Sequence, residues 1–195
     1  MKRLRVGLLG CGGIGARHAA AVGALQDEMQ LVACCAWNES KVREFAARFG
    51  AESFTELRRT LDSQIDLLIV ALPPFAHTGQ VEQAVAAGTH VLVEKPIALD
   101  MTRAQSMVDA AAKSGVVAVC GFMYRFGAAV KRWDAAAKAG EAGRVGLFMG
   151  QFHCNALHAD WWRERAKSGG QMVEQLIHIV LAAQQSAAAG REISL

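Results

Sequence analysis

Short apolar runs alternate with longer stretches of helical spacing along the first part of this chain. The apolar runs occupy residues 4–9, 31–36, 66–72, 90–93 and 116–120. The helical stretches between them occupy residues 14–25, 40–49, 76–87 and 101–113. Strands of a parallel sheet are buried on both faces, so they occur as continuous apolar runs joined by crossover helices. Right-handed crossovers then predict an α/β fold with a doubly wound parallel sheet over residues 1–121.

The pattern changes after residue 121. A helix is predicted at 126–139, a longer apolar strand at 145–154, a Trp-rich loop at 160–163 and a further helix from residue 171. We interpret residues 122–195 as the start of a second, α+β unit. The chain has 195 residues, 52% of them hydrophobic, and can therefore bury a core without disulfides or metal.

A glycine-rich turn follows the first predicted strand. Residues 10–15 read GCGGIG, a G-x-G-x-x-G pattern between a strand and a helix, which is the context that dinucleotide binding requires. Gly10 allows the tight turn, Gly12 lets the backbone approach a pyrophosphate, and Gly15 lets helix and strand pack closely. Gly13 and Ile14 begin the helix, whose N-terminus supplies free N–H groups to the anion. The turn predicts a Rossmann nucleotide site, because nothing later in the chain supports a methyltransferase-type loop.

The end of the second predicted strand lacks the acidic residue that usually holds the adenosine ribose. Trp37 and Asn38 stand there instead, and they could cover the adenine and hydrogen-bond a ribose hydroxyl. Lys41 or Arg43 could meet a 2′-phosphate. The alternative is that Trp37 packs against the protein and both cations lie on a helix surface. The predicted cofactor is therefore NAD or NADP.

Two groups of residues suit the chemistry of an alcohol oxidation. Glu94-Lys95-Pro96 follows a predicted parallel strand, at the edge where open α/β sheets bind ligands. Pro96 restricts Lys95 to extended backbone and can form a cis bond, so the ammonium can be aimed at a substrate oxygen. Glu174 and His178 share one helix face, where the carboxylate would raise the basicity of the imidazole for proton removal. A surface turn and a surface i,i+4 pair are the alternatives.

Other site chemistries find less support in the sequence. A metal site would need His153, Cys154, His158 and His178, whose spacing matches no established zinc pattern. A serine hydrolase would need a Gly-x-Ser-x-Gly turn, which the sequence does not contain. We therefore predict no metal and no hydrolase triad.

Charge and cysteine content limit the partners and the location. The net charge is +3, from 21 basic and 18 acidic residues, and predicts no nucleic-acid partner. Five cysteines without a Cys-x-x-Cys motif indicate reduced thiols in the cytoplasm. The N-terminus imitates a lipoprotein signal, but its apolar run before Cys11 is short for one. No stretch is long enough for a predicted membrane span.

Four motifs occur in order along the chain. They read GLLGCGGIGARH, DLLIVALPPFAHTGQVEQAVAAGTHVLVEKPIA, GFMYRFGAAVKRW and WWRERAKSGGQMVEQLIHIV. Together they resemble the glucose–fructose oxidoreductase/inositol dehydrogenase family (Gfo/Idh/MocA). The resemblance extends from residue 4 to about residue 180 and is far more specific than the glycine turn alone.

The resemblance implies roles for residues in each motif. Lys95 would touch substrate and nicotinamide, His178 would accept and donate the proton, and Glu174 would assist it. Cofactor contacts are further implied for Pro73, His77 and Glu94. Substrate contacts, besides Lys95 and His178, are implied for Tyr124, Arg125, Trp162 and Arg163.

The implied activity is that of an NAD(P)-dependent oxidoreductase, transferring a hydride between nicotinamide and a secondary alcohol or ketone of a sugar or cyclitol. The sequence departs from the family at Ala36, where the ribose-binding acid is expected, and at Leu181, where an Asp is usual. Family members add a large antiparallel sheet that forms the pocket floor and the subunit interface, and only its strand at 145–154 is expected here. We therefore expect a C-terminally truncated relative of homo-oligomeric enzymes. The alternative is a truncated nucleotide-binding module without turnover.

Overall fold

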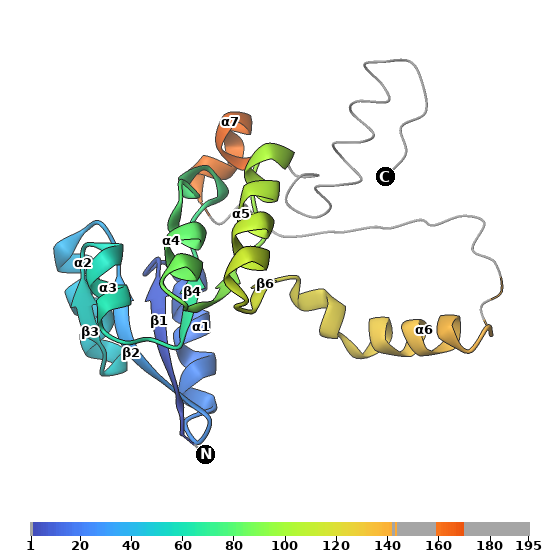
Figure 1. Cartoon of the computed structure of the whole chain (residues 1–195), viewed down its shortest axis with the longest axis horizontal. Coiled ribbons are helices and arrows are strands. Elements are labelled where there is room, and N and C mark those ends of the chain that lie inside the picture. The colour runs from blue at the N-terminus through green and yellow to red at the C-terminus, as the bar shows by residue number, and fades with distance from the viewer. Residues whose placement is uncertain (1, 142, 144–158, 170–195) are drawn as a thin grey trace.

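The computed structural model of this chain describes residues 2–141, 143 and 159–169, and its centre is a parallel sheet. The sheet has six strands in the order β3-β2-β1-β4-β5-β6, and every neighbouring pair is parallel. This is the strand order of a doubly wound Rossmann fold. The predicted fold of the first part is confirmed (Figure 1).

As far as β6, the elements follow one another as the apolar pattern predicts, with two additions. The strands are β1 (Leu4–Leu9), β2 (Met29–Cys35), β3 (Glu52–Phe54), β4 (Leu67–Val70), β5 (His90–Val93) and β6 (Ala118–Cys120). The α-helices are α1 (Gly13–Ala24), α2 (Glu39–Phe49), α3 (Leu57–Asp62), α4 (Gln80–Ala86), α5 (Met101–Ser114), α6 (Ala128–Lys138) and α7 (Arg165–Ser168). The 3-10 helices are η1 (Pro74–Ala76), η2 (Met123–Phe126) and η3 (Asp160–Arg163).

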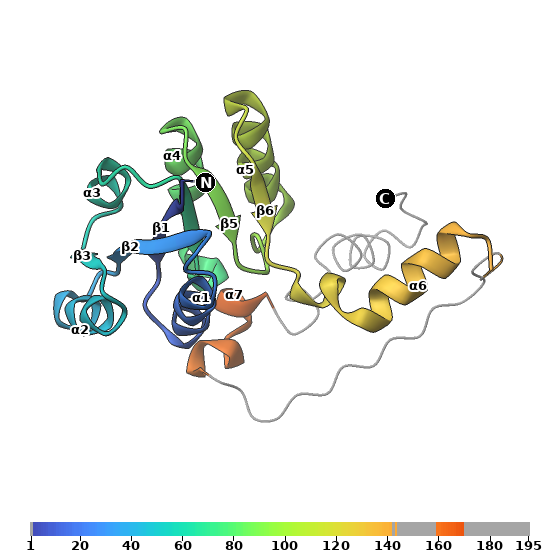
Figure 2. The same ribbon diagram turned by 90° about the horizontal axis from the view of Figure 1, so that it is seen from below.

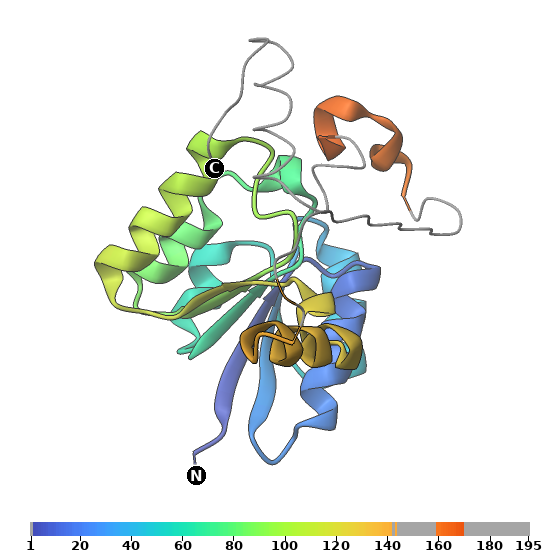
Figure 3. The ribbon, with the colours of Figure 1, turned by 90° about the vertical axis from the view of Figure 1, so that its right-hand side faces the viewer.

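Two apolar clusters lie on opposite faces of the sheet. One contains Val22 of α1 and Val42 of α2, packed with strand residues such as Leu8. The other contains Val85 of α4 and Met107 of α5 around Leu68, Val70 and Val91, with α3 packed against it. Figures 2 and 3 show the sheet edge-on between the two helix layers. Burial on both faces explains why the strands are apolar along their whole length.

Several elements differ from the prediction or were missing from it. The short edge strand β3 and the helix α3 were not expected, because three residues and six residues give little periodic signal. The predicted helix 76–87 is divided into η1 and α4. Pro74 starts η1, and Gly79 between the two has φ +137°, which a helix cannot include. Residues 160–163 form η3 rather than a loop.

Residues 122–141, which follow β6, lie away from the sheet. Helix α6 begins at Ala128 instead of residue 126, because Met123–Phe126 form η2 and Gly127 is the N-cap. Neither η2 nor α6 has a buried residue among those described. Figures 1 and 2 show α6 projecting from the domain. The predicted strand at 145–154 and the predicted helix from residue 171 lie outside the described residues.

Candidate nucleotide and active site

One row of residues across the sheet marks the edge where the predicted motifs meet. Register pairs Leu9 with Cys35 and Val70, Val70 with Val93, and Val93 with Cys120. The strands are parallel, so the segment after each of these residues emerges at the same edge. These segments contain the glycine turn, Trp37-Asn38, Pro73, Glu94-Lys95-Pro96 and Gly121. The structure therefore gathers residues from five strand ends, as the topology of a doubly wound sheet requires.

Two glycines of the turn are required by close backbone packing. Gly10 has φ +105°, and a Cβ there would lie 2.4 Å from the carbonyl oxygen of Ala71. A Cβ on Gly15 would lie 2.0 Å from the carbonyl oxygen of Gly10. A side chain at Gly10 would push the turn away from the segment after β4, and a side chain at Gly15 would push α1 away from the turn at the end of β1. The structural roles predicted for Gly10 and Gly15 are confirmed.

The other two glycines of the turn face open space. A Cβ on Gly12 or Gly13 would meet no described atom within 4 Å. Gly12 is the N-cap of α1, makes no side-chain cap, and the first helical turn has no acidic residue. The first N–H groups of a helix have no partner within it, and its dipole favours an anion there. These open, uncapped amides, including that of Ile14, fit the pyrophosphate of a dinucleotide.

The segment after β2 presents one exposed aromatic ring. Trp37 is 87% exposed, so the interpretation that it packs against the protein is wrong. Asn38 caps α2: its Oδ1 accepts from the backbone N–H of Lys41 at 3.0 Å and from the Ser40 hydroxyl at 2.9 Å. The amide nitrogen of Asn38 remains the group that can donate to a ribose. A terminal guanidinium nitrogen of Arg43 lies 2.6 Å from Oε1 of Glu39, one helical turn away. This ion pair holds Arg43 on the exposed surface of α2.

His77 is buried and faces the protein. Its Nδ1 lies 2.8 Å from the carbonyl oxygen of Ile97, and its Nε2 lies 3.3 Å from that of Leu72. A neutral ring has one N–H, and the shorter distance assigns it to Nδ1. Burial lowers the pKa of His77, which favours this neutral form. The ring thereby joins the loop after β4, which contains Pro73, to the loop after β5.

A charged network behind His77 supports the same loops and gave no signal in the sequence. Arg103 of α5 donates from Nε to the carbonyl oxygen of His77 at 3.0 Å. Its two terminal nitrogens bind both carboxylate oxygens of Glu82 on α4. Glu82 also accepts from Ser106 at 2.9 Å. Although burial opposes it, hydrogen bonding by Arg103 lowers the pKa of Glu82. The network connects α5 with α4 and with the loop that contains His77.

Lys95 and Trp162 are brought together from distant parts of the chain. The Lys95–Pro96 peptide bond is cis, as the sequence allowed. The ammonium nitrogen of Lys95 lies 5.8 Å from the ring centroid of Trp162, within cation–π range. The Trp162 ring contacts Trp161 edge-on at 5.6 Å, and Trp161 contacts Phe75 at 5.9 Å. A row of three contacting aromatic rings, Trp162, Trp161 and Phe75, therefore begins beside Lys95.

Other predicted substrate residues lie on nearby elements or outside the described chain. Tyr124 and Arg125 lie on η2, with Tyr124 60% exposed, and Arg163 ends η3. Glu174 and His178, with the rejected metal residues His153, Cys154 and His158, lie outside the described residues. Among the residues that are described, no group of three His, Cys, Asp or Glu could hold a metal.

His18 contacts a residue of the candidate site and was not singled out by the sequence analysis. Its Nε2 lies 2.8 Å from Oε1 of Glu94, which joins α1 to the Glu94-Lys95-Pro96 segment. The residue stands within the motif GLLGCGGIGARH, three positions after Gly15, but no spacing rule links it to a residue 76 positions away. Only the folded sheet edge brings the two together.

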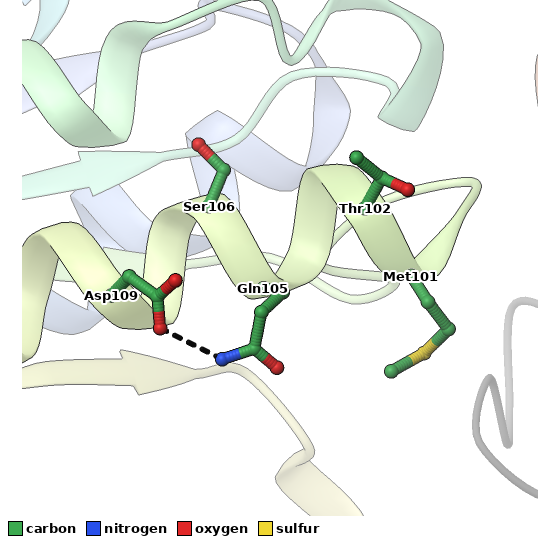
Figure 4. Close-up of a pocket in the computed structure, with 5 residues that line it drawn as sticks. All are labelled: Met101, Thr102, Gln105, Ser106 and Asp109. Carbon is green, nitrogen blue, oxygen red and sulfur yellow. Dashed lines mark hydrogen bonds between the residues drawn. The ribbon is translucent and has the colours of Figure 1, made fainter.

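An open hollow lies along α5, apart from this edge. Its lining residues are Met101, Thr102, Gln105, Ser106 and Asp109 (Figure 4). The Gln105 amide donates to Asp109 at 2.8 Å across one helical turn. The hollow includes no residue of the glycine turn or of Glu94-Lys95-Pro96, so it does not mark the candidate site. In the described chain no helix is both long and apolar enough to cross a membrane.

Comparison with known proteins gives the family. The model of the GFO_IDH_MocA oxidoreductase family, with an NAD-binding Rossmann fold, matches residues 4–122. The chain belongs to this family. The family, its enzyme class and the nicotinamide dinucleotide cofactor expected from the glycine turn are thereby confirmed at family level.

Relatives and solved structures agree with this assignment. Glucose-6-phosphate 3-dehydrogenase of Bacillus subtilis is 31% identical over 182 residues, which cover 90% of this chain and 51% of that protein. The crystal structure of GenD2 from gentamicin A biosynthesis, in complex with NAD, aligns with TM-score 0.78 and 29% identity over 92% of this chain and 52% of its own. Scyllo-inositol dehydrogenase of Lactobacillus casei, with NAD(H) and scyllo-inositol, aligns with TM-score 0.68 and 26% identity over 73% and 43%. The chain thus spans about half the length, or less, of these relatives.

Proposed function

We propose that this chain carries the nucleotide-binding part of an NAD(H)-dependent oxidoreductase that acts on a secondary alcohol or ketone carbon of a sugar or cyclitol. The observation that carries the proposal is the meeting of three groups at one sheet edge: the open glycine turn, Lys95 and the Trp162 ring. The division into a nucleotide-binding domain, 1–121, and a substrate domain beginning at 122 belongs to the same proposal. Neither apolar cluster contains a residue after Cys120 of β6 among those described, and this supports the boundary.

NAD(H) is the cofactor that we propose, in preference to NADP(H). The family description names NAD, and the GenD2 and scyllo-inositol dehydrogenase structures contain NAD or NAD(H). The engagement of Arg43 with Glu39 also supports this choice, because it removes one candidate partner for a 2′-phosphate. We propose that Trp37 covers the adenine and that the Asn38 amide donates to the ribose. When bound, NAD supplies the hydride acceptor at nicotinamide C4.

The residues of this chain would handle the substrate oxygen and its proton. The Lys95 ammonium would donate to that oxygen and stabilise the negative charge that develops on it. His178 would remove the hydroxyl proton, and Glu174 would hold the imidazole in the required tautomer. Trp162 would limit the space beside Lys95 and offer an apolar face to the C–H groups of a sugar ring. Tyr124, Arg125 and Arg163 are proposed as further substrate contacts.

Related proteins support the substrate class. The names of the relatives specify glucose 6-phosphate, myo-inositol and levoglucosan, which are all cyclic polyols. They are dehydrogenases, and no observation favours the alternative of a binding module without turnover. A cytoplasmic location is part of the proposal and is supported by the free thiols of Cys11, Cys34, Cys35 and Cys120.

The proposal is tested with all 195 residues of this sequence. NADH and NADPH are titrated by calorimetry, and a panel of inositols and sugar phosphates is screened for NAD reduction by absorbance. We expect NADH to bind at least ~10-fold more tightly than NADPH, and Lys95→Ala and His178→Ala each to lower turnover by ~100-fold or more. Binding without turnover on any polyol would favour the alternative module. Failure of both nucleotides to bind would contradict the nucleotide site itself.

A further inference from the structure

The Glu94 carboxylate holds two parts of the candidate site at once. Its Oε1 accepts from Nε2 of His18 on α1 at 2.8 Å. Its Oε2 accepts from the backbone N–H of Lys95 at 3.1 Å. The side chains of His18 and Glu94 are 22% and 19% exposed, so the contact is largely removed from solvent. One carboxylate therefore connects the helix after the glycine turn with the main chain of Lys95.

A third segment, at Gly121, packs against this carboxylate. A Cβ on Gly121, just after β6, would lie 3.4 Å from the carboxyl carbon and both oxygens of Glu94. Gly121 is held in place by its N–H, which donates to the carbonyl oxygen of Val93 at 2.8 Å. Burial, and next the Glu94 charge, raise the pKa of the neighbouring Cys120 thiol to about 11. The carboxylate thus sits between α1 and the end of β6, with little room to move.

The two partners of Glu94 belong to opposite ends of the proposed dinucleotide site. Helix α1 presents the open amides that suit the pyrophosphate, whereas Lys95 stands beside Trp162, where the nicotinamide and substrate are proposed. A displacement of a reacting group by about 1 Å can lower a rate by about 100-fold. Partly buried hydrogen bonds to a charged group hold such positions more firmly than contacts in water.

We infer that His18 is a positioning residue for Lys95, acting through Glu94. The imidazole donates from Nε2 to the carboxylate, which then holds the backbone N–H of Lys95 and sets the direction in which its side chain leaves the end of β5. No proton or electron is transferred in this role. The inference rests on the proposed function, because the role has meaning only if Lys95 contacts bound nucleotide or substrate.

The test is a double-mutant cycle on NADH affinity, measured by calorimetry with all 195 residues of this sequence. Lys95→Ala is made in the parent and in the His18→Leu background. We expect Lys95→Ala to weaken NADH about tenfold in the parent, and less than about twofold in the His18→Leu background, because the lysine is already displaced there. His18→Gln retains a donor and should restore the parent behaviour to within about threefold.

Controls separate positioning from a general loss of folding. Ala20→Gln, on an exposed position of α1, should leave NADH affinity and thermal unfolding unchanged. If His18→Leu does not fold, Gly121→Val provides a second route, because its side chain would push the Glu94 carboxylate while leaving His18 in place. In the Gly121→Val background, Lys95→Ala should likewise weaken NADH less than about twofold.

The outcomes distinguish this inference from the proposed function. An equal effect of Lys95→Ala in the parent and in the His18→Leu background would overturn the positioning role and leave the proposed function intact. Lys95→Ala without effect in the parent would overturn the role of Lys95 and, with it, that of His18. Failure of His18→Gln to restore the parent behaviour, in a folded protein, would also overturn the inference.

Discussion

Residues 2–121 and residues 122–141 both carry large apolar side chains, but only the first region buries them. In the first region, Leu8, Leu68 and Val70 are fully buried between two helix layers. In the second, Phe126 and Trp133 are 64% and 56% exposed. A helix such as α6 satisfies its backbone within itself, whereas a strand needs neighbours. The difference shows that tertiary packing specifies the first region, whereas α6 buries none of its own side chains against the residues that the structure describes.

The largest contrast is expected between a core and an exposed side chain. Leu68→Ala removes a fully buried side chain from β4 and should lower the free energy of unfolding by about 3 kcal/mol. Trp133→Ala on α6 should change it by less than about 0.5 kcal/mol. Urea unfolding of both variants measures the difference. Equal effects would show that α6 is packed in solution.

The next contrast lies within the glycine turn. Gly15→Ala places a Cβ 2.0 Å from the carbonyl oxygen of Gly10 and should cost about 2 kcal/mol of folding stability. Gly12→Ala meets no described atom within 4 Å and should leave stability within about 0.5 kcal/mol. It should nevertheless weaken NADH, because the methyl group enters the space proposed for the pyrophosphate. Thermal unfolding and calorimetry separate the two effects. Unchanged NADH affinity in Gly12→Ala would contradict the proposed pyrophosphate site at the start of α1.

A smaller effect should appear as a pH dependence of the first region. Burial lowers the pKa of His77 below 6.5, so the unfolded chain takes up this proton at a higher pH than the folded chain. The stabilisation from neutral His77 is therefore complete above about pH 6.5 and decreases as the pH falls, by up to about 1.4 kcal/mol per pH unit. The stability difference between parent and His77→Gln should shrink with acidification. A constant difference between about pH 7.5 and about pH 5 would contradict this assignment.

The smallest change in stability is expected at two exposed tryptophans, one in each region. Trp37→Ala and Trp133→Ala should both leave the free energy of unfolding within about 0.5 kcal/mol. Only Trp37→Ala should weaken NADH, by about tenfold, because a stacked base is worth about 1–3 kcal/mol. Calorimetry on both variants checks this. Equal NADH affinities of the Trp37→Ala and Trp133→Ala variants would contradict the proposed contact of Trp37 with the adenine.

Much of the candidate site could be predicted from local sequence. The glycine turn and Glu94-Lys95-Pro96 each follow an apolar strand, and parallel strands deliver such segments to one edge. The His18–Glu94 contact and the Arg103–Glu82 network could not be predicted, because their members are 76 and 21 positions apart with no periodic relation. The burial of His77 was also unforeseen, since its pattern resembles that of any loop histidine. Pairings between side chains of different elements depend on how those elements pack.

The sequence by itself determined the alternation of strands and helices, the doubly wound sheet and the position of the nucleotide turn. Those features follow from hydrophobic periodicity and from glycine conformation, which act within a few residues. Only the tertiary structure decided that Trp37 is exposed, that His77 faces two carbonyl groups, and that His18 reaches Glu94 beside Lys95. These contacts depend on the register of the strands and on the packing of helices across the sheet, which the chain acquires only when both core clusters form.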